Sequence, residues 1–158
     1  VPTGQNPLKP TSHGASPEHR LAMLRAAVEH DPLFRVSTIE IETKGPSYTE
    51  ATVRALIDRG ELVARPGLII GDDLLAQLPQ WRNLEKLLRA VYLVLVSRHG
   101  VDRSRLPEAA AQQAVVVKNP EIPVSSTGLR TRLREGRSVR YLVPEVVYEY
   151  IRRHALYQ

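Results

Sequence analysis

Three short apolar runs constrain the fold of this chain more strongly than any other feature of its sequence. They are "LIIG" at 68–71, the first part of "VYLVLVSRHG" at 91–100, where the strand is expected to end in Arg98, and "AVVVK" at 114–118. Runs of this length that are apolar on both faces are typical of strands buried inside a parallel sheet. Helical patterns separate the runs, so the sequence predicts an α/β domain with a mainly parallel sheet and flanking helices.

The other elements are predicted from caps and periodicity. A helix is expected to begin at Ser16-Pro17, with serine as N-cap and proline at the first helical position. The alternating segment "LFRVSTIEIE" at 33–42 predicts another strand, and Ser47 with Glu50 has the spacing of a capping box. Further helices are expected over 73–78, 83–89 and 107–113, after the hydroxyl residues 125–127, and after Pro144.

Composition excludes several function classes. The chain has no cysteine, which excludes disulfide bonds, thiol catalysis and cysteine-ligated metals. Its histidines show neither H-x-x-x-H nor H-x-x-H spacing, so no metal site on the protein is predicted. There is no signal peptide and no apolar run near the ~18 residues of a membrane span, so we expect a cytoplasmic protein without a membrane partner. The net charge of +5 predicts an anionic partner, which could be a nucleic acid, a nucleotide or an acidic surface.

Unusual polar residues gather where the strands are expected to end. In an open parallel sheet the carboxyl ends of the strands meet at one edge, and ligands bind outside that edge. We therefore expect one site there, built from four clusters. The clusters are Pro2-Thr3-Gly4-Gln5 with Lys9, Gly71-Asp72-Asp73, Ser97-Arg98-His99, and Ser125-Ser126-Thr127 with Arg130.

The segment "PVSSTGLRTRLREG" at 123–136 contains the residues of a phosphate site. A helix N-terminus presents unpaired amides and a partial positive charge. Ser126 and Thr127 add hydroxyl donors, and Arg130 adds a guanidinium group one turn into the helix. The pattern fits equally an ordinary cap followed by a solvated basic face. The arginines that follow are interpreted as surface charges: Arg132, Arg134, Arg137 and Arg140.

Three other groups fit either a small ligand or ordinary packing. Asp72 and Asp73 follow an apolar run, where a carboxylate can accept ribose hydroxyls or approach a metal, although aspartate also caps helices. Trp81 is the only tryptophan and can stack on a flat heterocycle, with Arg82 beside it for an anion, but a lone tryptophan more often packs in a core or at its rim. The segment "SYT" at 47–49 is either a helix cap or a group that presents a hydroxyl and amides to a small carboxylate.

Taken in order, these segments resemble the bacterial nicotinate-nucleotide adenylyltransferases of the nucleotidyltransferase superfamily. The resemblance covers nearly all 158 residues, and "GPSYTEAT", "IIGDDLL…W" and "SSTGLR" together are fairly specific, although no single one would be. It implies a Rossmann-like nucleotidyltransferase fold. It also implies adenylyl transfer from ATP to nicotinate mononucleotide in NAD biosynthesis, giving deamido-NAD and pyrophosphate, with Mg²⁺ accompanying ATP. The expected partners are these two substrates and no nucleic acid, and the oligomeric state is not predicted.

The resemblance also implies roles for the residues at matching positions. For nicotinate mononucleotide, Thr49 would meet the carboxylate, Trp81 would stack on the pyridine ring, and Arg82 would belong to the same subsite. Asp73 would bind the ribose or adenosine of ATP. The residues expected around the ATP phosphates are Ser126, Thr127, Arg130, Lys9 and Arg98, among which Arg130 and Lys9 are the catalytic candidates.

Two departures from the family pattern matter. Leu8 stands where the family has a histidine in a "PPHK"-like loop, which puts one substrate contact in doubt. The family's opening "G-x-F-D-P-x-H-x-G-H" signature, whose histidines contact the ATP phosphates, is absent from the sequence. We therefore expect an N-terminal strand and helix of about 40 residues to be missing. Residues 1–158 would then be the C-terminal four-fifths or so of a single nucleotidyltransferase domain, and would be inactive alone.

Other interpretations remain open at this point. The chain could be another adenylyl- or cytidylyltransferase of the superfamily, such as one acting on phosphopantetheine, and the "SYT" segment and Trp81 favour a pyridine substrate instead. It could be a fragment that binds nucleotide without turnover. It could also be a basic nucleic-acid-binding module. Against this, its basic residues are spread among acids, and only 5% of residues are aromatic, so there are few side chains on which bases could stack.

Overall fold

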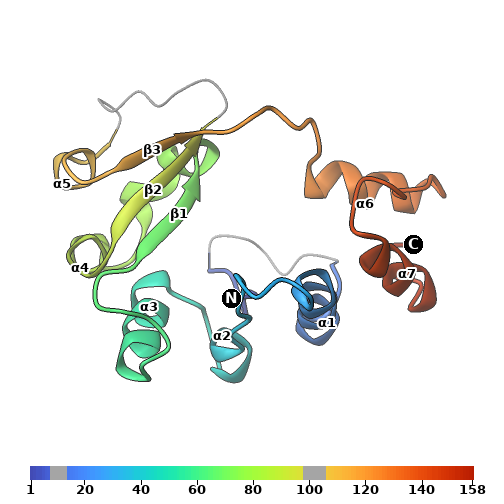
Figure 1. The fold of residues 1–158 in the computed structure, drawn as a ribbon, viewed down its shortest axis with the longest axis horizontal. Helices are drawn as coiled ribbons and strands as arrows, with labels where there is room; N and C mark the ends of the chain where they lie inside the picture. The colour runs from blue at the N-terminus through green and yellow to red at the C-terminus, as the bar shows by residue number, and fades with distance from the viewer. Residues whose placement is uncertain (8–13, 98–105) are drawn as a thin grey trace. The chain divides into compact units, whose positions relative to one another are not determined.

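The computed structural model describes residues 1–7, 14–97 and 106–158 of the chain (Figure 1). These residues divide into two compact units. Unit 1 contains both ends of the chain, Val1–Ser47 and Ile122–Gln158, and unit 2 contains the middle, Tyr48–Glu121.

A three-stranded parallel sheet organises unit 2. Its strands β1 (Gly67–Gly71), β2 (Tyr92–Ser97) and β3 (Val115–Lys118) lie in the order β1-β2-β3. Ile69 is paired with Val94, and Val94 with Val115, so the strands run side by side in parallel (Figure 1). The three apolar runs are therefore strands of one parallel sheet, as predicted, but the expectation that all three are buried is wrong for β3, none of whose residues is buried.

One face of this sheet is packed against helices and holds the core of unit 2. The covering elements are α3 (Thr49–Asp58), the 3₁₀ helix η1 (Asp72–Gln80), α4 (Leu84–Ala90) and α5 (Glu108–Ala111). Leu78 of η1, Leu87 of α4 and Leu93 of β2 are fully buried together in this core. Side chains alternate across a strand, and on the opposite face the structure has Ile69 and Val115 half or more exposed.

Unit 1 is helical in its described part. It contains α1 (Pro17–Val28), α2 (Ile39–Glu42), α6 (Ser126–Arg134) and α7 (Glu145–Arg153). Ser16 caps α1 as predicted, since its Oγ accepts the His19 N–H at 3.3 Å. Helix α1 packs against α7, where His19 Nδ1 is hydrogen-bonded to the Tyr150 hydroxyl at 3.0 Å and Ile151 is buried.

Two local predictions are wrong. The segment 33–42 is not a strand: residues 34–38 are irregular and Ile39–Glu42 is the short helix α2. The Thr38 carbonyl accepts the N–H groups of Ile41 and Glu42 at 2.9 and 3.0 Å, and the Thr38 hydroxyl donates to the Glu42 carboxylate. These local bonds satisfy the backbone without a partner strand.

The predicted capping box at the start of α3 does not form either. The N-cap is Tyr48, and no side chain accepts a capping bond there. Ser47 Oγ instead accepts the Gln5 N–H at 3.3 Å, and the Ser47 N–H donates to the Gln5 carbonyl at 2.8 Å. The Ser47 hydroxyl therefore makes a tertiary contact instead of the helix cap that the local pattern predicted.

Every helix in the described ranges is too short or too polar to cross a lipid bilayer.

Candidate functional site

The carboxyl ends of β1 and β2 lie side by side and carry one of the predicted clusters. Gly71 ends β1 and is paired with Val96, and Ser97 ends β2. Ser97 is fully buried, and its hydroxyl donates to Asp72 Oδ2 at 2.9 Å. Among the described residues, the Gly71-Asp72-Asp73 cluster and Ser97 therefore meet at one sheet edge, as predicted.

The two adjacent aspartates at this edge have different surroundings. Asp72 is half-buried and accepts the bond from Ser97, which ties its carboxylate to the end of β2. Asp73 is exposed, and a Cβ placed on Gly71 would lie 2.5 Å from Asp73 Oδ1. The missing side chain of Gly71 thus leaves the space in which the Asp73 carboxylate lies. Asp72 is suited to holding the edge together, and Asp73 to meeting a ligand.

A second part of unit 2 brings together the residues predicted for the pyridine substrate. Thr49 is the first residue of α3, and Trp81 immediately follows η1. The Arg82 guanidinium carbon lies 4.6 Å from the centre of the Tyr48 ring. This cation–π contact joins the residue before Thr49 to the residue after Trp81.

Trp81 itself is half-buried and packs against the hydrophobic core of unit 2. The backbone N–H of Trp81 donates to the Leu78 carbonyl at 3.1 Å, so the backbone is held to the end of η1. Arg82 is exposed beyond it. Packing against the core therefore accounts for the buried part of the Trp81 side chain. The exposed part is accessible for stacking on a flat ring.

Helix α6 carries the hydroxyl and arginine cluster in unit 1. Ser125 is its N-cap, and Ser125 Oγ accepts the Gly128 N–H at 3.1 Å. Ser126 and Thr127 are exposed in the first turn, and Arg130 Nη2 donates to Thr127 Oγ1 at 3.4 Å. The first turn thus presents hydroxyls, the positive end of the helix and a guanidinium group on the same stretch of surface.

The later arginines have partners within unit 1. Arg132 donates two bonds to the Ser138 carbonyl, at 3.2 and 3.0 Å. Arg140 is 2.8 Å from the Glu145 carboxylate. These contacts agree with the interpretation of this stretch as a charged surface.

The remaining predicted residues are distributed as follows. Thr49, Asp73, Trp81 and Arg82 belong to unit 2, whereas Ser126, Thr127 and Arg130 belong to unit 1. Lys9 and Arg98 lie outside the described residues. Sequence reasoning missed Ser97 as the partner of Asp72, and it missed a hydrogen bond between Asn83 and Glu50. The signal available in the sequence for Ser97 was a hydroxyl residue directly after an apolar run.

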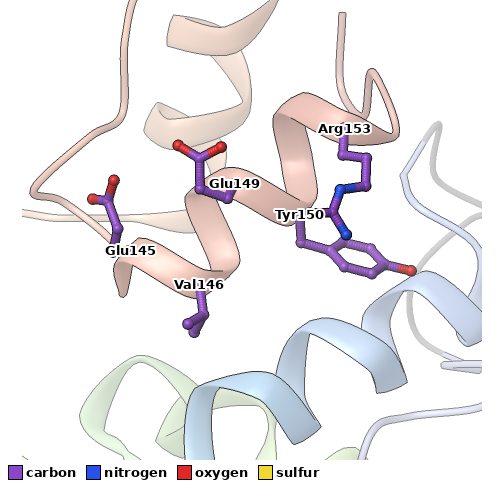
Figure 2. A pocket seen from close by; sticks show the side chains of 5 residues that line it. All are labelled: Glu145, Val146, Glu149, Tyr150 and Arg153. Carbon is purple, nitrogen blue, oxygen red and sulfur yellow. The ribbon is translucent and has the colours of Figure 1, made fainter.

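A hollow of about 300 Å³ on α7 lies apart from these groups in the sequence. Its lining side chains come from α7 alone (Figure 2) and are Glu145, Val146, Glu149, Tyr150 and Arg153. None of the predicted site residues lines it.

Over the described ranges, no three histidines, aspartates or glutamates are grouped so that they could hold a metal ion.

Comparison with known proteins identifies the relatives of this chain. A probable nicotinate-nucleotide adenylyltransferase of Roseiflexus sp. (strain RS-1) is 43% identical over 163 residues, covering all of this chain and 81% of the relative. The corresponding protein of Halalkalibacterium halodurans is 39% identical over 159 residues, covering all of this chain and 75% of the relative.

Solved structures agree at the level of the fold. A Plasmodium falciparum nicotinic acid mononucleotide adenylyltransferase complexed with NaAD has a TM-score of 0.69 at 15% identity, over 98% of this chain and 78% of that one. The same Plasmodium enzyme complexed with APC also has a TM-score of 0.69, at 16% identity, over 90% of this chain and 76% of that one. The family model described as cytidylyltransferase-like matches residues 1–132. The chain therefore belongs to the nicotinate-nucleotide adenylyltransferases, within the cytidylyltransferase-like family.

Proposed function

We propose that this protein transfers the adenylyl group of ATP to nicotinate mononucleotide, which yields deamido-NAD and pyrophosphate in NAD biosynthesis. Membership of the nicotinate-nucleotide adenylyltransferases carries this proposal, since the relatives match along the whole chain. The fold agrees, because the described strands form a parallel sheet whose carboxyl edge bears polar groups.

In this reaction a 5′-phosphate oxygen of the mononucleotide attacks the α-phosphorus of ATP. The bond from that phosphorus to the oxygen bridging the α- and β-phosphates breaks, and pyrophosphate leaves with the electron pair. The enzyme needs no covalent intermediate, so catalysis consists of positioning the two substrates and stabilising the charge that develops. Mg²⁺ enters bound to the ATP phosphates, as part of the substrate.

We assign the nucleotide phosphates to the first turn of α6. Ser126 and Thr127 offer hydroxyl donors there, and Arg130 is already turned toward the Thr127 hydroxyl. Arg130 would stabilise the negative charge of the transferring phosphoryl group. Lys9 and Arg98 are further candidates for this role by their positions in the family pattern.

We assign the ribose of ATP and the pyridine ring of nicotinate mononucleotide to residues of unit 2. Asp73 is exposed at the end of β1, where its carboxylate can accept ribose hydroxyls. Trp81 would stack on the pyridine ring, and Thr49 would meet the nicotinate carboxylate at the N-terminus of α3. Arg82 would add positive charge beside that carboxylate.

We further infer that both units belong to one nucleotidyltransferase domain. The match to the family model runs over residues 1–132 and thus passes from unit 1 through unit 2 and back into unit 1. A single cooperative transition in thermal unfolding, seen alike by far-UV circular dichroism and by Trp81 fluorescence, would support this inference. Two separated transitions would contradict it.

The activity is tested by incubating the protein with ATP, Mg²⁺ and nicotinate mononucleotide and separating the products. The protein should carry any residues that its gene encodes ahead of Val1. Deamido-NAD and pyrophosphate are expected in equal amounts. Nicotinamide mononucleotide and phosphopantetheine serve as alternative acceptors in parallel reactions. A folded protein that yields no deamido-NAD, or that prefers phosphopantetheine, would reject the proposal.

A further inference from the structure

Two contacts join the start of α3 to the segment that follows η1. The Arg82 guanidinium carbon lies 4.6 Å from the centre of the Tyr48 ring, and Asn83 Nδ2 donates to Glu50 Oε2 at 3.1 Å. The contacts flank Thr49 on one segment and follow Trp81 on the other. All of these residues lie in unit 2.

Asn83 is unusual in how it uses its side chain. It is the N-cap of α4, a position where an asparagine oxygen ordinarily accepts a backbone N–H of the first turn. Here its side chain makes no capping bond, and its backbone is left-handed, with φ of 54° and ψ of 36°. Asparagine tolerates this conformation better than most residues. The amide is thereby directed to α3 instead of to its own helix.

Glu50 is the acceptor, and it is a buried carboxylate whose residue is only 9% exposed. Its other oxygen faces Arg54 at 3.8 Å, but the Arg54 side chain is 68% exposed. A loose contact with an exposed arginine contributes little. The bond from Asn83 is the shorter of the two and comes from a different element, so it links α3 to the segment containing Trp81.

We propose that Glu50 and Asn83 are positioning residues, which hold the Trp81–Arg82 segment against the N-terminus of α3 and so fix the subsite for the pyridine mononucleotide. The inference rests on the proposed function, because that function assigns Thr49 and Trp81 to this substrate. Neither residue needs to touch the substrate. Without the bond, the segment would leave its binding geometry for part of the time, and apparent affinity falls in proportion to the fraction that remains competent.

Kinetics on four variants test the role of the bond. Asn83→Gly removes the donor but keeps a residue that accepts the left-handed backbone. Glu50→Ala removes the acceptor, and the double variant tests whether the two effects are coupled. A hydrogen bond to a charged group corresponds to about a tenfold effect or more, so KM for nicotinate mononucleotide should rise about tenfold in either single variant. The double variant should be no worse than either, KM for ATP should change less than about twofold, and Arg54→Ala should match the wild type.

Exchanging the two groups gives a stricter test. Asn83→Asp alone sets a second carboxylate against Glu50 and should raise this KM at least as much as Asn83→Gly does. Adding Glu50→Gln to Asn83→Asp lets the amide donate in the opposite direction, and it should restore KM to within about threefold of the wild type. A role in helix stability alone predicts no such rescue, because Glu50→Gln removes the acid from the first turn of α3.

Fluorescence gives a readout that does not depend on activity. Trp81 is the only tryptophan of the 158-residue chain, so its anisotropy and its quenching by acrylamide report on this segment alone. Asn83→Gly and Glu50→Ala should lower the anisotropy and raise the quenching constant, whereas Arg54→Ala should not. Melting temperatures measured in parallel show whether each variant is folded.

The outcomes separate this inference from the proposed function. If the wild type makes no deamido-NAD, the proposed function fails, and the fluorescence still decides whether the bond immobilises Trp81. If the wild type is active and Trp81→Ala raises KM for the mononucleotide, but Asn83→Gly and Glu50→Ala change neither this KM nor the fluorescence, the positioning role is overturned while the function stands. A rise in both KM values together, without rescue by the exchange, would also overturn it.

Discussion

Gly71→Ala should impair ATP use through the neighbouring Asp73 with little loss of stability. Gly71 has φ of −77° and ψ of 157°, an extended conformation that alanine adopts without strain. The added Cβ would lie 2.5 Å from Asp73 Oδ1, whereas ordinary contact begins at 3.4 Å. The atom it meets is the end of a flexible side chain, so the carboxylate should move by about 0.9 Å while the backbone stays in place.

The size of the effect follows from what that carboxylate is proposed to do. A hydrogen bond between a charged group and a ribose hydroxyl contributes about 1.5–3 kcal/mol, which corresponds to a factor of roughly 10 to 100. A displacement of nearly 1 Å removes most of such a bond. We therefore expect kcat/KM for ATP to fall about 10- to 100-fold. The melting temperature should change by less than about 3 °C, because alanine also lowers the entropy of the unfolded chain.

The assay measures initial rates of pyrophosphate release over a range of ATP concentrations at saturating nicotinate mononucleotide. Asp73→Ala is the matched variant, and Gly71→Ala is measured both in the wild type and in the Asp73→Ala background. If the new methyl group acts only through the carboxylate, the double variant should be within about twofold of Asp73→Ala.

Two results would refute this reasoning. An equal loss from Gly71→Ala in the Asp73→Ala background would show that the methyl group obstructs something other than that carboxylate. Unchanged kinetics in Gly71→Ala, beside a large loss in Asp73→Ala, would show that the carboxylate tolerates the displacement.

Four other variants give further tests. Trp81→Ala should raise KM for nicotinate mononucleotide about tenfold, given the usual strength of stacking on a heterocycle, with less than about a twofold change for ATP; the reverse pattern would remove Trp81 from the pyridine subsite. Arg130→Ala should lower kcat about 100-fold, as removal of one charge-stabilising donor usually does, with little change in melting temperature; normal turnover would count against the phosphate role. Ser125→Ala removes the oxygen that accepts the Gly128 N–H and should lower the free energy of unfolding by about 1 kcal/mol in urea titrations; no loss would mean that water replaces the cap. Leu78→Ala empties a fully buried position and should lower the same free energy by about 2–5 kcal/mol; a loss below 1 kcal/mol would contradict the tight packing of that core.

The parallel sheet could be predicted because its signal is local. A strand inside a parallel sheet is an uninterrupted apolar run, and the strands predicted at 68–71, 91–98 and 114–118 coincide with β1, β2 and β3 to within a few residues. Caps that depend on near neighbours were also predictable. Ser16 and Ser125 each accept a backbone N–H three residues ahead, as their sequences indicate.

Elements whose partners are distant in the sequence were not predictable. Ser47 has the spacing of a cap, but its hydroxyl is engaged with Gln5, 42 positions earlier. Glu50 was assigned to the same capping box and instead accepts from Asn83, 33 positions later. The alternation at 33–42 fits a strand, but the short helix α2 satisfies its backbone locally. For Ser47 and Glu50 the deciding interaction lies outside the window from which the pattern was read, whereas in the segment 33–42 local bonds from Thr38 replace the predicted strand.

The candidate site was predictable in its residue types and less so in its geometry. Polar groups at the ends of apolar runs indicated the pair Asp72 and Asp73, since parallel strands bring their carboxyl ends together, and only the family resemblance favoured Asp73. Nothing in "GDD" distinguishes the two acids, and it is the buried Ser97 at the end of β2 that ties Asp72 to the sheet edge. The left-handed backbone of Asn83 had no signal in the sequence either, because asparagine is strongly preferred as an ordinary helix cap.

The contact between α1 and α7 can form only after the ribosome has synthesised both helices. His19 and the Tyr150 hydroxyl that it meets are 131 positions apart, and the whole of unit 2 is translated between them. At the usual 5–20 residues per second, His19 is added to the chain roughly 7 to 26 s before Tyr150. Unit 2 can complete its own core in that interval, whereas α1 has no α7 to pack against and is exposed to chaperones and proteases until α7 has been made.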